Sequence, residues 1–162
     1  MLSKMNIGSL SLKSNIFLAP MAGITDLPFR VLTRKLGSSL CFTEMVSANG
    51  LVRRTHKSYE YLKSSPDDSP LGVQIFGSDP DILCEAAGIV TALGADLIDI
   101  NAGCPVKKVL KTGAGAALMR DPAKFGAIVK NIRKATHLPL TVKIRSGWGH
   151  DELNAIEIAG IA

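Results

Sequence analysis

The sequence predicts an α/β fold with a parallel sheet, arranged as a (β/α)8 barrel of which this chain supplies about the first five units. Short apolar runs rich in β-branched residues alternate with longer segments of helical period, which is the pattern of successive βα units. Several of these runs also carry polar residues near their ends, as strands do at the mouth of a barrel. The first observation alone also allows an open doubly wound sheet.

Local signals mark the individual elements. Asp79-Pro80 and Asp121-Pro122 each pair an N-cap aspartate with a proline in the first helical turn. A Gly/Ala-rich loop, about residues 103–119, lengthens the interval before the last strand. Helices are expected to begin near four positions: Leu27, Val52, Pro80 and Pro122. The expected strands are Ile16 to Met21, Leu40 to Val46, Leu71 to Phe76, Leu97 to Asn101 and Leu138 to Ile144.

The last expected strand favours the barrel over the open sheet. Period-two alternation places Val142 and Ile144 on the face that helices cover and leaves Lys143 and Arg145 on the other face. Asp99 and Asn101 alternate with isoleucines in the preceding strand, and Gln74 alternates with Val73 and Ile75. Polar groups from several strands are thus expected inside the barrel mouth.

Composition bounds the class of protein. The 162 residues are 46% hydrophobic, enough to bury a core. No run of about 18 uncharged apolar residues occurs, and no secretory signal opens the chain, so we expect a cytoplasmic protein without a membrane partner. Neither a disulfide framework nor a metal site is predicted, because no cysteine pair or histidine has ligand spacing. The residues considered are Cys41, Cys84, Cys104, His56, His137 and His150.

Charge is distributed unevenly along the chain. Residues 66–100 hold seven acids and no lysine or arginine, whereas residues 104–145 hold ten basic residues and only Asp121 as an acid. A basic segment of this size suits a polyanion such as RNA, because neutralised phosphates release counterions. Solvated helix faces are the alternative explanation.

Length suggests that residues 1–162 are the N-terminal portion of a barrel domain. A complete barrel usually needs about 250 residues. Residues 151–162 have a helical pattern but no glycine or basic C-cap, so we expect the sequence to stop inside a helix. The five-strand sheet would then have two unprotected edges.

Six segments in family order carry a resemblance to tRNA-dihydrouridine synthases, especially the bacterial B-type. Each segment is weak alone, but together they fall at nearly every expected strand end. They are APMAGITDLPFR (19–30), TEMVSA (43–48), VQIFG (73–77), GADLIDINAGCPVKKV (94–109), GAGAALM (113–119) and TVKIRSGW (141–148).

The resemblance implies a TIM-barrel domain that binds FMN, followed by a small helical tRNA-binding domain. The second half of the barrel and the helical domain would be absent from this chain. It further implies reduction of specific tRNA uridines, with NADPH or NADH as the reductant. The partner is tRNA, and no stable protein partner is predicted.

The reaction requires a hydride at uracil C6 and a proton at C5. A flavin can give the hydride, so a side chain must give the proton. By resemblance the donor is Cys104, which follows the fourth expected strand. A thiol with a pKa near 8.5 is mostly protonated at neutral pH and can act as a general acid. Cys41 and Cys84 are interpreted as buried apolar residues.

Five residues are candidates for holding the flavin. Lys143 would lie beside the N1 and O2 edge, where the reduced ring carries negative charge. An internal ion pair with Asp99 or Glu44 is the alternative. Gln74 could hydrogen-bond the pyrimidine edge, since an amide both donates and accepts. The turn formed by Pro20, Met21 and Ala22 would bring backbone groups against the ring, or else be an ordinary strand-to-helix turn.

The remaining candidates concern the substrate. Asn101 could read a uracil edge, or alternatively cap a loop, and Arg145 would contact the uracil by resemblance. A uracil must leave its stack to reach such a site, which calls for an electropositive approach surface. Lys107 and Lys108, with Lys111, could meet tRNA phosphates, although a solvated loop is the simpler alternative.

Two other interpretations remain open. A dihydroorotate dehydrogenase-like FMN barrel acting on a free pyrimidine would use a similar loop, but the segments at residues 19–30 and 141–148 argue against it. An inactive truncated fragment with residual RNA binding is the other.

Overall fold

A curled parallel sheet forms the centre of the computed structural model, which describes residues 3–162. Its strands run in the order β3-β4-β6-β7-β8, and β5 pairs with β6 beyond the end of β4. All pairs in this sheet are parallel. The bounds are β3 Phe17–Leu18, β4 Leu40–Phe42, β5 Val46–Ser47, β6 Leu71–Phe76, β7 Leu97–Asn101 and β8 Leu140–Lys143.

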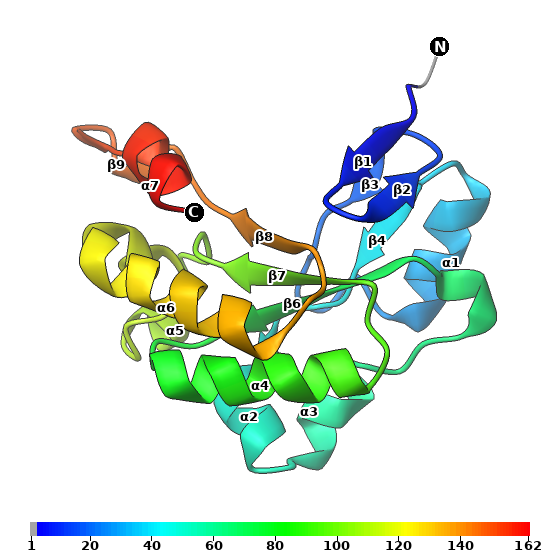
Figure 1. Ribbon diagram of the computed structural model, residues 1–162, viewed down its shortest axis with the longest axis horizontal. Helices are drawn as coiled ribbons and strands as arrows, with labels where there is room; N and C mark the ends of the chain where they lie inside the picture. Colours follow the sequence, from blue (N-terminus) through cyan, green and yellow to red (C-terminus); the bar gives the residue numbers. More distant parts are fainter. Residues whose placement is uncertain (1–2) are drawn as a thin grey trace.

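Helices cover the convex side of the sheet and leave the concave side open (Figure 1). This is the half barrel that the sequence predicts, and the predicted α/β barrel class is confirmed. The helices are α1 Leu27–Lys35, α2 Ala48–Val52, α3 His56–Glu60, α4 Pro80–Ala92, α5 Lys107–Leu110, α6 Pro122–Ala135 and α7 Ala155–Ile161, with the 3₁₀ turns η1 Pro66–Asp68 and η2 Gly115–Arg120.

The helix starts show why these segments fold locally. The carboxylate of Asp79 accepts hydrogen bonds from the backbone N–H groups of Asp81 and Ile82 at the start of α4. Asp121 caps α6 in the same way through Lys124 N–H, and a proline follows each aspartate. The two predicted N-caps are confirmed, and each satisfies N–H groups that the first helical turn leaves unpaired.

Alternation along the strands divides the core from the concave face. Val73, Ile75, Ile98 and Ile100 are buried against α4 and α6, and Val142 packs at the edge of the same cluster. The residues between them, which include Gln74 and Asp99, face the concave side. The predicted division of each strand is therefore confirmed.

A hairpin of β1 Met5–Ile7 and β2 Leu10–Leu12 lies at the N-terminal end of the strands (Figure 1). Leu12 packs with Leu40, Phe42 and Leu97 in a small second core. Sequence analysis missed this hairpin because its two strands are three residues each and only Leu12 among them is buried. The hairpin covers the N-terminal end of the half barrel, opposite to the carboxyl ends of the strands.

Several predicted boundaries are wrong. The expected strand at residues 16–21 is only β3, and the expected strand at 40–46 is two short strands that flank Thr43 to Met45. The helix expected to start near Val52 instead ends at that residue. It begins at Ala48, because the Ser47 side chain caps its first turn by accepting a hydrogen bond from Gly50 N–H. The loop at 103–119 contains α5 and much of η2, since its small residues allow tight turns.

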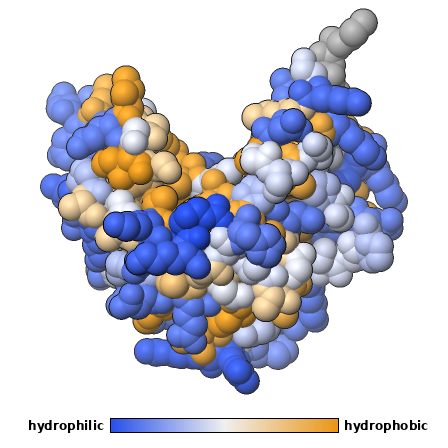
Figure 2. All heavy atoms as spheres, viewed as in Figure 1, coloured by the Kyte–Doolittle hydropathy of each residue, from blue (hydrophilic) through white to orange (hydrophobic). Residues whose placement is uncertain are grey.

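The C-terminal segment adds a hairpin, β9 Gly147–Gly149 with β10 Glu152–Leu153, before α7. Ile158 of α7 is buried in the main core, whereas Ile156 is 91% exposed. In the space-filling view this segment and the β1–β2 hairpin rise on either side of a hollow (Figure 2). The hollow is the open concave side of the sheet.

Candidate active site

A cavity of about 210 Å³ lies at the C-terminal ends of β6, β7 and β8. In a parallel barrel this is the end at which loops place chemical groups. The cavity brings together residues from five successive βα units. Its lining consists of Pro20, Ala22, Met45, Gln74, Asn101, Gly103, Cys104, Pro105, Val106 and Lys143.

Six of the ten predicted site residues line this one cavity, although the sequence spreads them over more than a hundred positions. The six are Pro20, Ala22, Gln74, Asn101, Cys104 and Lys143. The remaining four, which are Met21, Arg145, Lys107 and Lys108, lie around it.

A chain of buried hydrogen bonds forms the floor of the cavity. Gln74 Nε2 donates to Asp99 Oδ2 at 2.6 Å, and Asn101 Nδ2 donates to Gln74 Oε1 at 2.8 Å. Thr141 Oγ1 donates to the other Asp99 oxygen at 2.6 Å. Because every partner is a protein atom, the network is satisfied without water.

Asn101 also organises the loop that carries Cys104. Its Oδ1 accepts hydrogen bonds from Cys104 N–H at 2.9 Å and from Gly103 N–H at 3.3 Å. This is the loop-capping arrangement that the sequence left open as an alternative to uracil reading. Asn101 also lines the cavity, although protein partners already engage both its amide nitrogen and its amide oxygen.

Gly115 lets the GAGAALM segment approach Cys104 closely. Ala116 N–H donates to the Cys104 carbonyl at 3.0 Å. A Cβ on Gly115 would lie 2.7 Å from that carbonyl oxygen, and the φ angle of Gly115 is +63°. Only glycine fits here without displacing Cys104. The thiol itself is partly exposed and forms no disulfide.

Lys143 is the cation of the cavity. It is the Cα partner of Asn101 across the β7–β8 pair, and its side chain is exposed at the cavity wall. The alternative ion pair with Asp99 or Glu44 is not present among residues 3–162. Burial nevertheless raises the pKa of Asp99, and Lys143 is one of the groups that oppose the rise.

The turn after β3 is held from both sides. Thr25 Oγ1 donates to the Met21 carbonyl, and Met21 N–H donates back to the same hydroxyl. Glu44 accepts a short hydrogen bond from Gly23 N–H. These contacts fix the backbone next to Pro20 and Ala22, while the Met21 side chain is not part of the cavity lining.

Three basic residues surround the cavity. The Arg145 side chain packs over Gly103, where a Cβ would lie 3.4 Å from Arg145 Cγ. Lys107 and Lys108 are exposed in the first turn of α5, just beyond Pro105 and Val106. All three are therefore on the same side of the sheet ends as Cys104.

Sequence analysis did not name four of the lining residues, which are Met45, Gly103, Pro105 and Val106. Met45 lies between β4 and β5, and its sulfur accepts a long contact of 3.7 Å from Asn101 Nδ2. It also missed the role of Thr43, whose hydroxyl accepts from Gln74 N–H at 3.2 Å. The TEMVSA segment contains Thr43 and Met45, so the sequence showed the motif. It did not show that Met45 lines the cavity and that Thr43 binds the backbone of Gln74.

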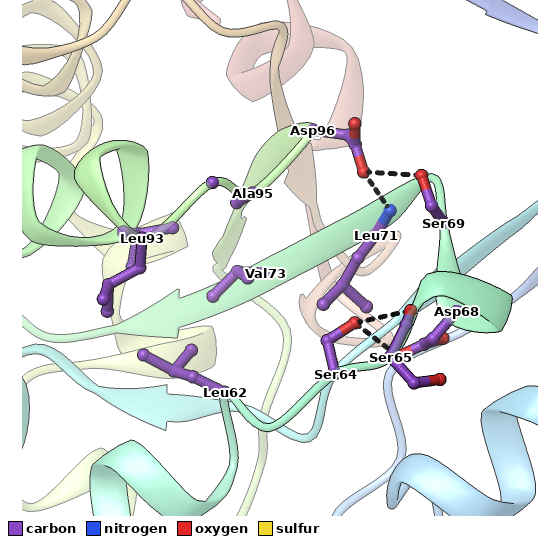
Figure 3. Close-up of a pocket in the computed structure, with 12 residues that line it drawn as sticks. Leu62, Ser64, Ser65, Asp68, Ser69, Leu71, Val73, Leu93, Ala95 and Asp96 are labelled. Carbon is purple, nitrogen blue, oxygen red and sulfur yellow. Dashed lines mark hydrogen bonds between the residues drawn. The ribbon is translucent and has the colours of Figure 1, made fainter.

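A second pocket lies at the opposite ends of the strands, around Leu71 and Asp96 (Figure 3). Asp96 Oδ2 accepts from Leu71 N–H at 2.6 Å, and Asp68 is paired with Arg30 and Arg34. Its carboxylates are thus occupied by fixed internal partners. We therefore assign the chemistry to the cavity at Cys104.

The described residues offer neither a metal site nor a membrane-spanning helix. Across residues 3–162, no group of three or more histidine, cysteine or acidic side chains is arranged to hold a metal ion. Within the same residues no helix combines the length and the apolar character needed to cross a membrane.

Comparison with known proteins identifies the family. Residues 17–162 match the family model described as dihydrouridine synthase (Dus). The chain belongs to the dihydrouridine synthase family. It is 48% identical over 158 residues to tRNA-dihydrouridine synthase B of Pasteurella multocida (strain Pm70), covering 98% of this chain and 48% of that protein. It is 44% identical over 161 residues to the protein of that name from Pseudomonas aeruginosa PAO1, covering 99% and 48%.

A solved structure supports the fold. Histamine dehydrogenase from Rhizobium sp. 4-9 superposes with a TM-score of 0.63 at 12% identity, covering 98% of this chain and 34% of that one. At this identity the likeness concerns architecture alone. The chain spans about half the length of the curated relatives that it matches.

Proposed function

We propose that this chain forms the proton-donating half of a flavin-dependent tRNA-dihydrouridine synthase, which reduces the C5–C6 double bond of uracil in tRNA. The observation that carries the proposal is one cavity lined by both Cys104 and Lys143. An acid and a cation at the ends of barrel strands suit a reaction that protonates carbon next to a negatively charged cofactor. The relatives' name, tRNA-dihydrouridine synthase B, supports the choice of substrate.

The lining residues fit FMN as the cofactor. Lys143 can interact with the electron-rich edge of the ring, and Gln74 retains a second N–H and a second lone pair for the pyrimidine edge. Pro20 and Ala22 present a small apolar wall, fixed by the hydrogen bonds around Met21 and Gly23. When bound, the flavin would supply the hydride, and NADPH or NADH would restore it.

Cys104 would hold the proton for C5. Its carbonyl is bound by Ala116 and its N–H by Asn101, so the backbone that carries the thiol is fixed on both sides. A fixed donor avoids the entropy cost of positioning it during the reaction. Asn101 and Arg145 are the residues proposed to contact the uracil ring.

The approach of tRNA would use basic groups at the rim. Lys107, Lys108 and Arg145 lie on the same side as the thiol, and long cationic side chains can neutralise phosphates while the base is extruded. This surface places positive charge close to the point at which an extruded uridine would enter.

The experiment uses cells that lack the gene for the protein containing this chain. Their tRNA nucleosides are measured by mass spectrometry with and without the restored gene. A gain of two hydrogen atoms at specific uridines with the restored gene is the expected result. If the restored gene changes no uridine, while the purified protein reduces a free pyrimidine, the proposal is wrong and the dihydroorotate dehydrogenase-like interpretation replaces it.

A further inference from the structure

Asp99 lies directly beneath the cavity but is not part of its lining. In the strand register Gln74 pairs with Asp99, and Asp99 pairs with Thr141, so the three form one row across β6, β7 and β8. Side chains of Cα partners in neighbouring strands point to the same face and can touch. The row is therefore a polar layer on the concave face of the sheet.

The direction of every hydrogen bond above Asp99 is determined. Backbone N–H groups only donate, so Asn101 must present Oδ1 to Cys104 and therefore Nδ2 to Gln74. Gln74 must then present Oε1 to Asn101 and Nε2 to Asp99. An ionised carboxylate only accepts hydrogen bonds, so Asp99 can be bound only by the NH₂ end of the Gln74 amide and not by its oxygen.

Burial makes this direction consequential. The exposed fractions are 1% for Gln74, 4% for Asp99 and 8% for Asn101. Water cannot readily replace a lost partner at such sites, and an unpaired buried amide is costly. A substitution at Asp99 is thus expected to change the hydrogen bonds of the two amides, because water cannot readily replace the lost acceptor.

We propose that Asp99 is a positioning residue, which fixes the orientation of the Gln74 and Asn101 amides and through them the backbone at Cys104. The importance of Cys104 rests on the proposed function, but the positioning itself is a property of this chain alone. Asp99 is not part of the cavity lining, and the two amides connect its carboxylate to the backbone at Cys104.

Substitutions at Asp99 separate acceptor from charge. Asp99→Leu leaves Gln74 Nε2 without its acceptor, so the Gln74 amide keeps only the hydrogen bond from Asn101 and holds Asn101 less firmly. Asp99→Asn keeps an oxygen for Gln74, while its NH₂ group can donate to the Thr141 hydroxyl, which is able to accept. The asparagine variant should therefore preserve the loop and the leucine variant should loosen it.

The test measures alkylation of each cysteine by iodoacetamide in the full chain, resolved by peptide mass spectrometry. Cys41 is fully buried and reports unfolding, whereas Cys84 on α4 reports local opening away from the site. We expect Cys104 to react at least about five-fold faster in Asp99→Leu than in wild type, the scale of a lost buried hydrogen bond. Cys41 should stay protected, and Asp99→Asn should react like wild type.

Three results would overturn the proposal. The first is an alkylation rate of Cys104 in Asp99→Leu that equals the wild-type rate. The second is an Asp99→Asn variant in which Cys104 reacts as fast as in Asp99→Leu. If Cys41 becomes labelled in Asp99→Leu, the comparison is repeated with Asp99→Ser, which is too short to reach Gln74. The third result is labelling of Cys41 in Asp99→Ser as well, which would mean that Asp99 stabilises the whole fold and not the loop in particular. No flavin or tRNA takes part, so failure of the proposed function leaves this outcome unaffected.

Discussion

The two ends of the sheet use similar residues in opposite ways. At the N-terminal end, Asp68 is fully buried and is held by Arg30 and Arg34, and Asp96 binds the start of β6. At the C-terminal end, Lys143 has no ion pair within residues 3–162, and the Cys104 thiol is partly exposed. The carboxylates at the N-terminal end are thus paired and serve stability, whereas Lys143 and Cys104 at the C-terminal end have no such partner among the described residues and remain available for chemistry.

The largest expected effect is on stability, at the N-terminal end. Asp68→Ala leaves the Arg30 guanidinium, 1% exposed, without its carboxylate. Breaking one side of a buried ion pair typically costs about 3–5 kcal/mol. The free energy of unfolding, measured with urea, should fall by that amount. Asp67→Ala, an exposed neighbour in η1, is the matched control and should change little. Equal stability of the two variants would contradict the comparison.

The next effect concerns the support of Cys104. Gly115→Ala places a Cβ against the Cys104 carbonyl at a positive φ, so the loop must shift. We expect the rate of uridine reduction to fall about ten- to hundred-fold, as for a misplaced catalytic group. Gly88→Ala on α4, where a Cβ meets no atom within 4 Å, should leave the rate unchanged. A Gly115→Ala enzyme of normal rate would show that the close approach is unimportant.

A smaller effect is expected at the rim. Replacing Lys107 and Lys108 by alanine should weaken tRNA binding and reduce the slope of log affinity against log salt by about one to two units. The matched control replaces Lys130 and Lys134, exposed residues of α6, which ends at the opposite end of the sheet. Similar losses in both double variants would indicate non-specific attraction and not a docking surface.

The smallest effect is the pH dependence of stability due to Asp99. Burial raises the pKa of its carboxyl above the ordinary 3.8, so the folded protein retains this proton more readily than the unfolded chain. Stability contributed by the protonated form is therefore lost as the pH rises from 3.8 toward the raised folded pKa. Relative to Asp99→Asn, the wild-type free energy of unfolding should decrease over that window. A difference that does not vary with pH would contradict the raised pKa.

The sequence was sufficient for the division of the strands. Period-two alternation correctly separated Val73 and Ile75 from Gln74, and the motifs named six residues that line one cavity. It could not show that both ends of the Gln74 amide are occupied, because the partners Asp99 and Asn101 lie 25 and 27 residues away. The β1–β2 hairpin was missed because tertiary contacts of Leu12, and not its local pattern, hold it in place.

The most direct test of the central claim is single-turnover reduction of tRNA by the pre-reduced full protein, comparing Cys104→Ala with Cys84→Ala. We expect Cys104→Ala to retain bound flavin and a normal unfolding free energy but to form dihydrouridine at least about 10²-fold more slowly, the usual scale for a general acid. Cys84→Ala, altered on the helix-covered side of the sheet, should react at the wild-type rate. Equal rates in the two variants would remove Cys104 from the reaction and contradict the account.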